Sequence, residues 1–369
     1  MTEWKRADTD WMHKARWGMM THYLYELTDT EDASDEAVHK FWRDWDAGAR
    51  PGIIPESSEK AAIEQWNRRV DSVNVDALAQ HIAETGAGYL VFTVGQTSGF
   101  FCSPNATYDG ILAMDHTRLS RRDLVADVAA ALAKRNVRTI VYIPAGPSYQ
   151  HPRAVEALAC VPEWDASGWG IKPGAYSSKH PVDERLTEYQ RNWESVIREW
   201  SLRWGTLASG WWVDGCYYAD KMYRHEDAPN FRSFAEAMKA GNPNAVVAFN
   251  TGVRIHCHTE YEDYTAGESN DLYTLVSPSA PFYRFMGGAQ LHIMTFMGMF
   301  WCTGNPRFPD GLPALYTRHI NSFGGVVTWD VPIRPDGTIR DALWRQLDRI
   351  GQEMRNPQIK SGRRPHESG

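Results

Sequence analysis

An apolar run that ends in a carboxylate, residues 210–215 (GWWVDG), is the segment of this chain most suited to chemistry. In a parallel α/β barrel the C-terminal ends of the strands build the active site, so an acid at such an end faces a substrate. Asp214 is therefore the first candidate for a catalytic group. The alternative is that Asp214 only caps the next helix or turns the loop, because Asp is favoured in both places.

Sixteen tryptophans are a high number for a chain of 369 residues. Barrels that process sugars place aromatic faces against the apolar side of a pyranose, together with two carboxylates that flank the glycosidic bond. Trp212 and Trp301 are the predicted substrate contacts of this kind. For any single tryptophan, packing in the core is the alternative.

A second chemistry is suggested by His256-Cys257-His258, which resembles the H-x-H of metal-dependent barrel hydrolases. Asp214 or Glu260 could complete such a site. The pair follows the predicted fifth strand by several residues, and a slip of one residue would turn both imidazoles to solvent. The favoured prediction has no metal, and the metal-dependent hydrolase is kept as an alternative.

No cofactor is predicted either. The chain contains neither GxGxxG nor GxxxxGK[ST], and no predicted strand ends in the lysine that Schiff-base chemistry requires. Five scattered cysteines without CxxC spacing indicate reduced thiols. Cys216, two positions after Asp214, is the cysteine expected to be reactive.

Short apolar runs alternate with amphipathic segments along almost the whole chain, which is typical of βα units around a parallel sheet. Strands are predicted at residues 16–22, 89–94, 139–143, 210–214, 245–250, 263–265, 291–294 and 325–330. Helices are predicted from Asn74 to Gly86, from Ser120 and Asp123 to Asn136, from Tyr189 to Gly205, around Phe234 and Met238, and from Ile339 to Ile350.

These elements predict an α/β fold, a single (β/α)8 TIM-like barrel over residues 1–356. An insertion is expected at about 26–70, and residues 357–369 are expected to be a disordered polar tail. The formal charge of −7 disfavours a nucleic-acid partner. No apolar run approaches the roughly 20 residues needed to cross a bilayer, so no membrane partner and a cytoplasmic location are expected.

Five segments together resemble the α-L-fucosidases of glycoside hydrolase family 29. They are residues 11–22 (WMHKARWGMMTH), 83–89 (AETGAGY), 122–125 (RDLV), 212–215 (WVDG) and 324–339, with GGVV at its start and PDGTI at its end. They occur in the family's order and span roughly residues 11 to 351. The resemblance covers only the family's catalytic barrel. The family's C-terminal β-sandwich is not expected in this chain.

The resemblance also implies roles for individual residues. In that family the Asp of the Trp-x-Asp-Gly motif is the nucleophile of a retaining double displacement, which points to Asp214. Residues 263–268 (DYTAGE) are similar to a family stretch whose last Glu serves as acid/base, which points to Glu268. Glu262 is the second choice, although Glu260, Glu262 and Asp263 can each be a solvated loop charge. His22 and Asn250 would lie beside the sugar.

Two departures from the family concern the recognition of the sugar. Residues 95–99 (GQTSG) stand where the family carries His-His-Asp-Gly, and Tyr23-Leu24 replaces the Trp-Gly that follows the first-strand His. Gln96 and Tyr23 are therefore the predicted replacements as substrate contacts. The expected function is a retaining, exo-acting glycoside hydrolase for a small glycoside or oligosaccharide, with altered sugar specificity. A non-catalytic carbohydrate-binding protein on a hydrolase barrel is the alternative from another class.

Overall fold

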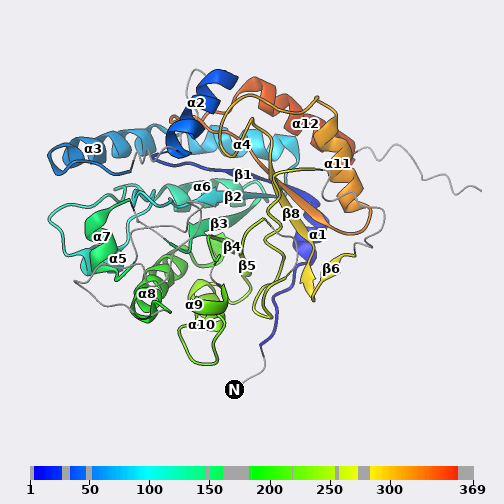
Figure 1. Ribbon diagram of the computed structural model, residues 1–369. Coiled ribbons are helices and arrows are strands. Elements are labelled where there is room, and N and C mark those ends of the chain that lie inside the picture. The colour runs from blue at the N-terminus through cyan, green and yellow to red at the C-terminus, as the bar shows by residue number, and fades with distance from the viewer. Residues whose placement is uncertain are drawn as a thin grey trace, which may run out of the picture.

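A parallel sheet runs through the centre of the molecule, with helices on its outer side (Figure 1). The computed structural model describes residues 4–26, 34–46, 52–146, 150–160, 183, 185–217, 219–253, 257–272 and 283–355. Seven strands pair in the order β5-β4-β3-β2-β1-β9-β8. They are β1 (Trp17–Thr21), β2 (Tyr89–Thr93), β3 (Arg138–Pro144), β4 (Ala208–Asp214), β5 (Val246–Phe249), β8 (His292–Phe296) and β9 (Val326–Asp330).

An irregular extended segment, residues 263–269, closes the gap between β5 and β8. On one side the Asp263 amide donates to the carbonyl of Val247 at 2.8 Å. On the other side the Met294 amide donates to Gly267, and the Ser269 amide donates to Met294, each at 2.8 Å. The predicted sixth strand lies inside this closing segment. Seven regular strands and the closing segment thus form the expected (β/α)8 TIM-like barrel.

Most helices lie between successive strands, as the βα pattern predicts. Outside the insertion, the described helices are α1 (Asp10–Ala15) before β1, then α4 (Val75–Thr85), α5 (Ala106–Leu112), α6 (Leu124–Ala133), α7 (Pro152–Ala157), α8 (Thr187–Trp204), α9 (Ala219–Met222), α10 (Phe231–Met238) and α11 (Leu312–Asn321), and finally α12 (Asp341–Arg355) after β9. The predicted insertion contains α2 (Asp35–Asp46) and α3 (Glu56–Ser72). A short hairpin of β6 (Phe285–Met286) and β7 (Ala289–Gln290) precedes β8.

The capping residues explain where the helices begin and end. The Asn74 side chain accepts the Ala77 amide at 3.1 Å, and Gly86 ends α4 in the left-handed conformation, so both predicted boundaries are confirmed. In α6 the N-cap is Asp123, whose side chain accepts the Ala126 amide at 3.0 Å. The prediction that Ser120 opens this helix was three residues too early.

Alternation along the strands separates an outer core from the barrel interior. On β4, Trp211 and Val213 pack in the outer core beneath the helices, whereas Trp212 packs inside the barrel with Tyr142 and Met20. Because successive strand residues point to opposite faces, the residue two positions beyond Trp212 also faces inward. That residue is Asp214.

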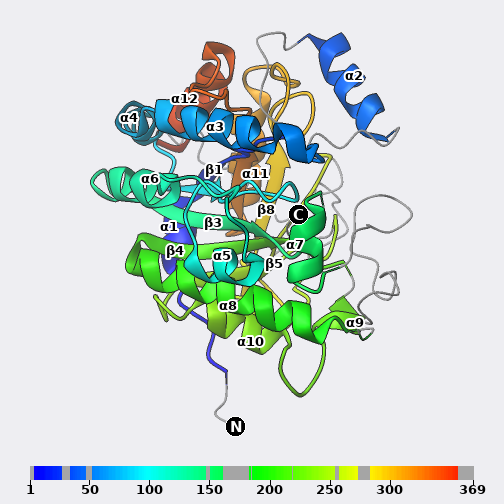
Figure 2. The same cartoon turned by 90° about the vertical axis from the view of Figure 1, so that its left-hand side faces the viewer.

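The C-terminal ends of the strands open on one side of the molecule. Figure 2 shows α2, α7 and α9, which follow β1, β3 and β4, on the side opposite α1, which precedes β1. None of the described helices is both long and apolar enough to cross a membrane. The predicted tail at 357–369 lies outside the described residues.

Candidate active site

A cavity of about 420 Å³ opens at the C-terminal ends of the strands. This volume is within the range of pockets that bind small ligands. Six of the predicted site residues line it: His22, Gln96, Trp212, Asp214, Glu268 and Trp301.

Asp214 is the last residue of β4 and accepts hydrogen bonds on both carboxylate oxygens. Its Oδ2 accepts the Tyr142 hydroxyl at 2.6 Å and the Gln96 amide at 3.4 Å. Its Oδ1 accepts the Asn250 amide at 2.8 Å. Because three donors converge on this carboxylate, its side chain is held in one orientation.

Glu268 is joined to Asp214 through the side chain of Asn250. The same Asn250 Nδ2 donates to Glu268 Oε2 at 2.5 Å. Since both oxygens contact one nitrogen, Asp214 Oδ1 and Glu268 Oε2 lie at most 5.3 Å apart. Burial, followed by the charge of Asp214, raises the pKa of Glu268 to about 7, while the Asn250 hydrogen bond opposes this rise.

The backbone position of Glu268 depends on the glycine before it. Gly267 has φ +66°, and a Cβ at this position would lie 1.9 Å from the carbonyl oxygen of His292. Only glycine allows the closing segment to approach β8 this closely. The close approach therefore carries Glu268 into the cavity.

His22 is held by a carboxylate that the sequence reasoning missed. His22 Nδ1 lies 2.7 Å from Asp330 Oδ1, and Asp330 is fully buried at the end of β9. The other oxygen, Asp330 Oδ2, accepts the Cys302 amide at 2.7 Å. With Nδ1 occupied, Nε2 is the ring nitrogen of His22 that remains for a ligand in the cavity.

Tyr142 is the second residue that was missed, and of the two only Asp330 had a detectable signal in the sequence. Asp330 is an acid at the end of a predicted strand, which is the criterion that selected Asp214. Tyr142 belongs to the predicted third strand, and its ring stacks on Trp212 with centroids 5.3 Å apart. Its inward direction follows only from the register of β3 against β4.

Tyr23 lies outside the cavity, which corrects its predicted role as a substrate contact. Its ring packs in the outer core beside Trp66 and Phe92, and its hydroxyl donates to the carbonyl of Pro335 at 2.7 Å. The cause is alternation, because His22 faces inward and the next residue must face outward.

Glu262 and Asp263 are not solvated loop charges. Glu262 is fully buried and accepts the amides of His258, Thr259 and Phe249 at 2.6, 2.9 and 3.2 Å. Asp263 is also buried and accepts Lys239 Nζ at 2.7 Å. Neither residue lines the cavity, whereas Glu260 is exposed as a loop charge would be.

Cys216 is not placed for reactivity. It is fully buried, and burial raises the pKa of its thiol well above the ordinary value, which disfavours the reactive thiolate. His256 of the alternative H-x-H site lies outside the described residues. Among the residues that are described, no three His, Cys, Asp or Glu side chains gather as a metal site would require.

Comparison with known proteins agrees with this architecture. The sequence profile of the alpha-L-fucosidase family matches residues 2–283. No curated protein matches the chain by sequence. The solved structures that resemble it include alpha-L-fucosidase isoenzyme 1 from Paenibacillus thiaminolyticus, at 17% identity and a TM-score of 0.59, covering 94% of this chain and 75% of that one.

Two further structures share the fold. One is a glycoside hydrolase family 29 alpha-L-fucosidase from Bacteroides thetaiotaomicron, trapped as a covalent intermediate, at 14% identity and a TM-score of 0.59, covering 96% of this chain and 76% of that one. The other is an endo-fucoidan hydrolase of glycoside hydrolase family 107, at 17% identity and a TM-score of 0.61. That match covers 78% of this chain, which spans about half (51%) of the hydrolase.

The structural matches show the barrel, and the family profile covers most of the chain, including Asp214 and Glu268. The chain therefore belongs to the alpha-L-fucosidase family of glycosidases.

Proposed function

We propose that this protein is a retaining, exo-acting glycoside hydrolase, with Asp214 as nucleophile and Glu268 as acid/base. One observation carries the proposal: the single Asn250 amide that contacts both carboxylates and keeps their nearest oxygens within 5.3 Å. Retaining glycosidases hold their carboxyl groups about 5–5.5 Å apart, whereas inverting enzymes need roughly 6.5–9.5 Å to admit a water.

In the first step a carboxylate oxygen of Asp214 bonds to the anomeric carbon. The glycosidic bond breaks, and the leaving oxygen takes the proton of Glu268. In the second step Glu268 accepts a proton from water, the water oxygen bonds to the anomeric carbon, and the bond to Asp214 breaks. The unequal surroundings support this division of roles, because Asp214 accepts three hydrogen bonds and Glu268 has a pKa raised to about 7.

We also propose that the preferred sugar differs from fucose. Gln96 lines the cavity where the family presents imidazoles, and its amide donates to Asp214 Oδ2 and to the Tyr142 hydroxyl. When a site lacks the donors that bind particular sugar hydroxyls, it has a weaker preference for the sugar that carries those hydroxyls. A panel of aryl glycosides measures this: an aryl α-L-fucoside should be a poor substrate, and a wide preference for it would contradict the proposal.

The catalytic roles are tested by two substitutions. Asp214→Asn should lower kcat for an aryl glycoside by roughly 10⁴-fold or more with the fold intact, and Asp214→Gly should regain turnover with azide. Glu268→Gln should slow an alkyl glycoside on the order of 10²–10⁴-fold and an activated aryl glycoside much less, because a phenolate leaves without a proton.

Glu260→Gln is the matched control, since this exposed acid lies outside the cavity. Near-normal kcat in Asp214→Asn would falsify the nucleophile assignment. Turnover of any glycoside by the wild-type protein excludes the non-catalytic sugar-binding alternative.

A further inference from the structure

An aromatic wall of the cavity takes no part in the proposed chemistry. Trp42 from α2 packs against Phe300 with centroids 4.5 Å apart, and Trp301 follows in the same loop after β8. All three side chains line the cavity. Segments more than 250 residues apart in the chain therefore build one surface.

One member of the wall, Trp301, is linked to the segment that carries Glu268, and it also contacts His22 with centroids 6.2 Å apart. Trp301 Nε1 donates to the side-chain oxygen of Asn270 at 3.0 Å, and Asn270 follows Glu268 by two residues in the closing segment. Tyr142 and Gln96, by contrast, contact Asp214. Because a general acid must lie within hydrogen-bond reach of the oxygen it protonates, the leaving group departs on the acid's side.

The wall is held in place before any ligand binds. Arg307 donates to the Asn270 carbonyl at 3.0 Å and to the Phe296 carbonyl at 3.1 Å, and its guanidinium lies 3.6 Å from the centroid of the Phe296 ring. Phe296 in turn contacts Phe300 and Trp301 with centroids 5.2 and 5.0 Å apart. Such preorganisation lowers the entropic cost of binding.

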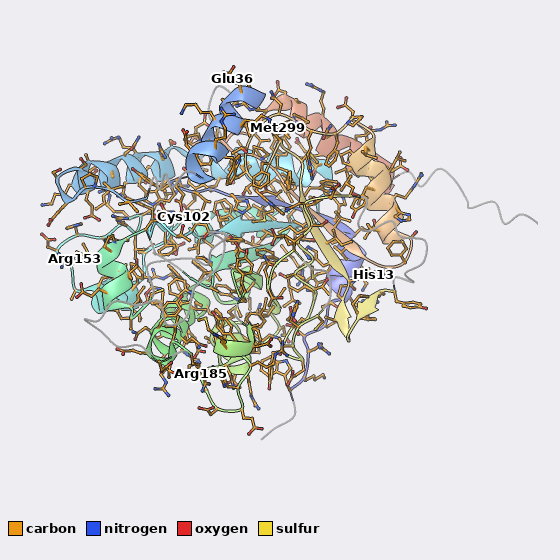
Figure 3. The ribbon with its side chains drawn as sticks, in the orientation of Figure 1. His13, Glu36, Cys102, Arg153, Arg185 and Met299 are labelled. Atoms are coloured by element: carbon orange, nitrogen blue, oxygen red, sulfur yellow. The ribbon has the colours of Figure 1, made fainter. Side chains whose placement is uncertain are left out.

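The insertion supplies the remaining face. The Trp42 indole donates to the Thr303 hydroxyl at 3.4 Å, so α2 is docked on the loop that carries Phe300. Figure 3 shows Met299, the neighbour of Phe300, on the side of the molecule where α2 lies. The predicted insertion thus contributes a side chain to the cavity.

We infer that Trp42, Phe300 and Trp301 form a subsite for the leaving group, and that the leaving group of the substrate carries a ring with an apolar face. The inference rests on the proposed function. Aromatic side chains bind the flat face of such a ring, whether it is an aryl group or the apolar side of a pyranose. A small alkyl leaving group would leave the wall without a partner.

The test compares methyl and benzyl glycosides of the sugar that the wild-type protein hydrolyses best. Both leaving groups are alkyl alcohols that need a proton from Glu268, so the ring is the main difference between them. Trp42→Ala and Phe300→Ala should each lower kcat/KM for the benzyl glycoside roughly 2- to 12-fold more than for the methyl glycoside, which is the usual contribution of an aromatic contact. In a disaccharide of the same sugar the leaving group is a pyranose, so this substrate shows whether the subsite binds a pyranose or an aryl ring.

His39→Ala is the matched control, because His39 is an exposed residue of α2 and does not line the cavity. Equal losses on methyl and benzyl glycosides, or the same benzyl-specific loss in His39→Ala, would overturn the subsite. Absence of any turnover would instead overturn the proposed function.

Binding to the Asp214→Asn protein gives a readout that needs no turnover. Calorimetric titration should show the benzyl glycoside bound more tightly than the methyl glycoside, and adding Trp42→Ala should remove this difference. Equal affinities in the Asp214→Asn protein would overturn the subsite independently of the catalytic result.

Discussion

Asn250 brings together two carboxylates that must be in opposite protonation states at the start of the reaction. Its amide contacts both Asp214 and Glu268, and burial and the neighbouring charge raise the pKa of Glu268 to about 7. A raised pKa keeps the acid form at neutral pH, which is the form that donates the proton.

The pH profile should therefore have an alkaline limb that belongs to Glu268. Its acid form is complete well below pH 7 and is lost as the pH rises through about 7, so kcat/KM for an alkyl glycoside should fall over that interval. In Glu268→Gln, assayed on the same alkyl glycoside, this limb should be absent from the residual activity. Persistence of the same limb in that variant would assign it to another group.

Asp330 should decide which ring nitrogen of His22 carries the proton. As a carboxylate it accepts from His22 Nδ1 and from the Cys302 amide. In Asp330→Asn the amide oxygen can still accept from Cys302, so the amide nitrogen faces Nδ1 and the proton moves to Nε2. We expect ¹⁵N NMR of labelled histidines to show this tautomer change and kcat/KM to fall about 10- to 100-fold, the worth of one charge-assisted hydrogen bond.

The exposed Asp71→Asn is the control for this substitution. An unchanged His22 spectrum in Asp330→Asn would show that Asp330 does not set the tautomer. A loss of activity that merely follows a loss of folded protein would give Asp330 a structural role.

At the scale of elements, a buried side chain holds the turn at residues 259–262, just before the closing segment, against β5. Glu262 accepts three backbone amides, one of which belongs to Phe249, the residue before Asn250. This contact links the turn to the residue that spans the two carboxylates. Glu262 thus supports the site through the backbone of Phe249. The alternative prediction had made Glu262 the acid/base.

Glu262→Ala should lower the free energy of unfolding by roughly 2–5 kcal/mol, because it leaves two buried amides and one partly buried amide without this acceptor. The preference for aryl over alkyl glycosides should stay as in the wild type, since the proton donor remains. Denaturant titration and the two-substrate assay measure these effects, with Glu260→Ala as the exposed neighbour for comparison. A selective loss on alkyl glycosides would return the acid/base role to Glu262.

At the scale of the whole molecule, Asp263 ties together segments that lie far apart in the chain. Its side chain accepts the Ala7 amide at 2.6 Å, the Val247 amide at 2.9 Å and Lys239 Nζ at 2.7 Å. The N-terminal segment, β5 and the residue after α10 therefore meet where the barrel closes. Lys239 supplies the positive charge that lies against this buried carboxylate.

Lys239→Met should destabilise the fold by roughly 3–5 kcal/mol, because it leaves the buried Asp263 carboxylate without its counter-charge. The double variant Lys239→Met/Asp263→Asn should recover part of this loss, since the uncompensated charge is gone. Thermal and urea unfolding report both, and the exposed Lys134→Met serves as control. If the double variant is no more stable than the single one, Lys239 does not stabilise the fold by neutralising the Asp263 carboxylate.

The sequence by itself determined the features that depend on residues close together in the chain. Alternation of apolar runs and amphipathic segments predicted the barrel, the caps at Asn74 and Gly86 predicted α4, and the strand-end position predicted that Asp214 faces the cavity. These inferences hold because helix periodicity, capping and strand alternation are local properties.

Only the tertiary structure decided which distant side chains meet. That Asn250 contacts Glu268 as well as Asp214, and that Asp330 holds His22, depends on strand register and on barrel closure through Gly267. A shift of one residue turns a side chain from the interior to the outer core, which is why Tyr23 packs outside the cavity while its neighbour His22 lines it. Burial, and with it the raised pKa of Glu268, arises only when these segments pack together.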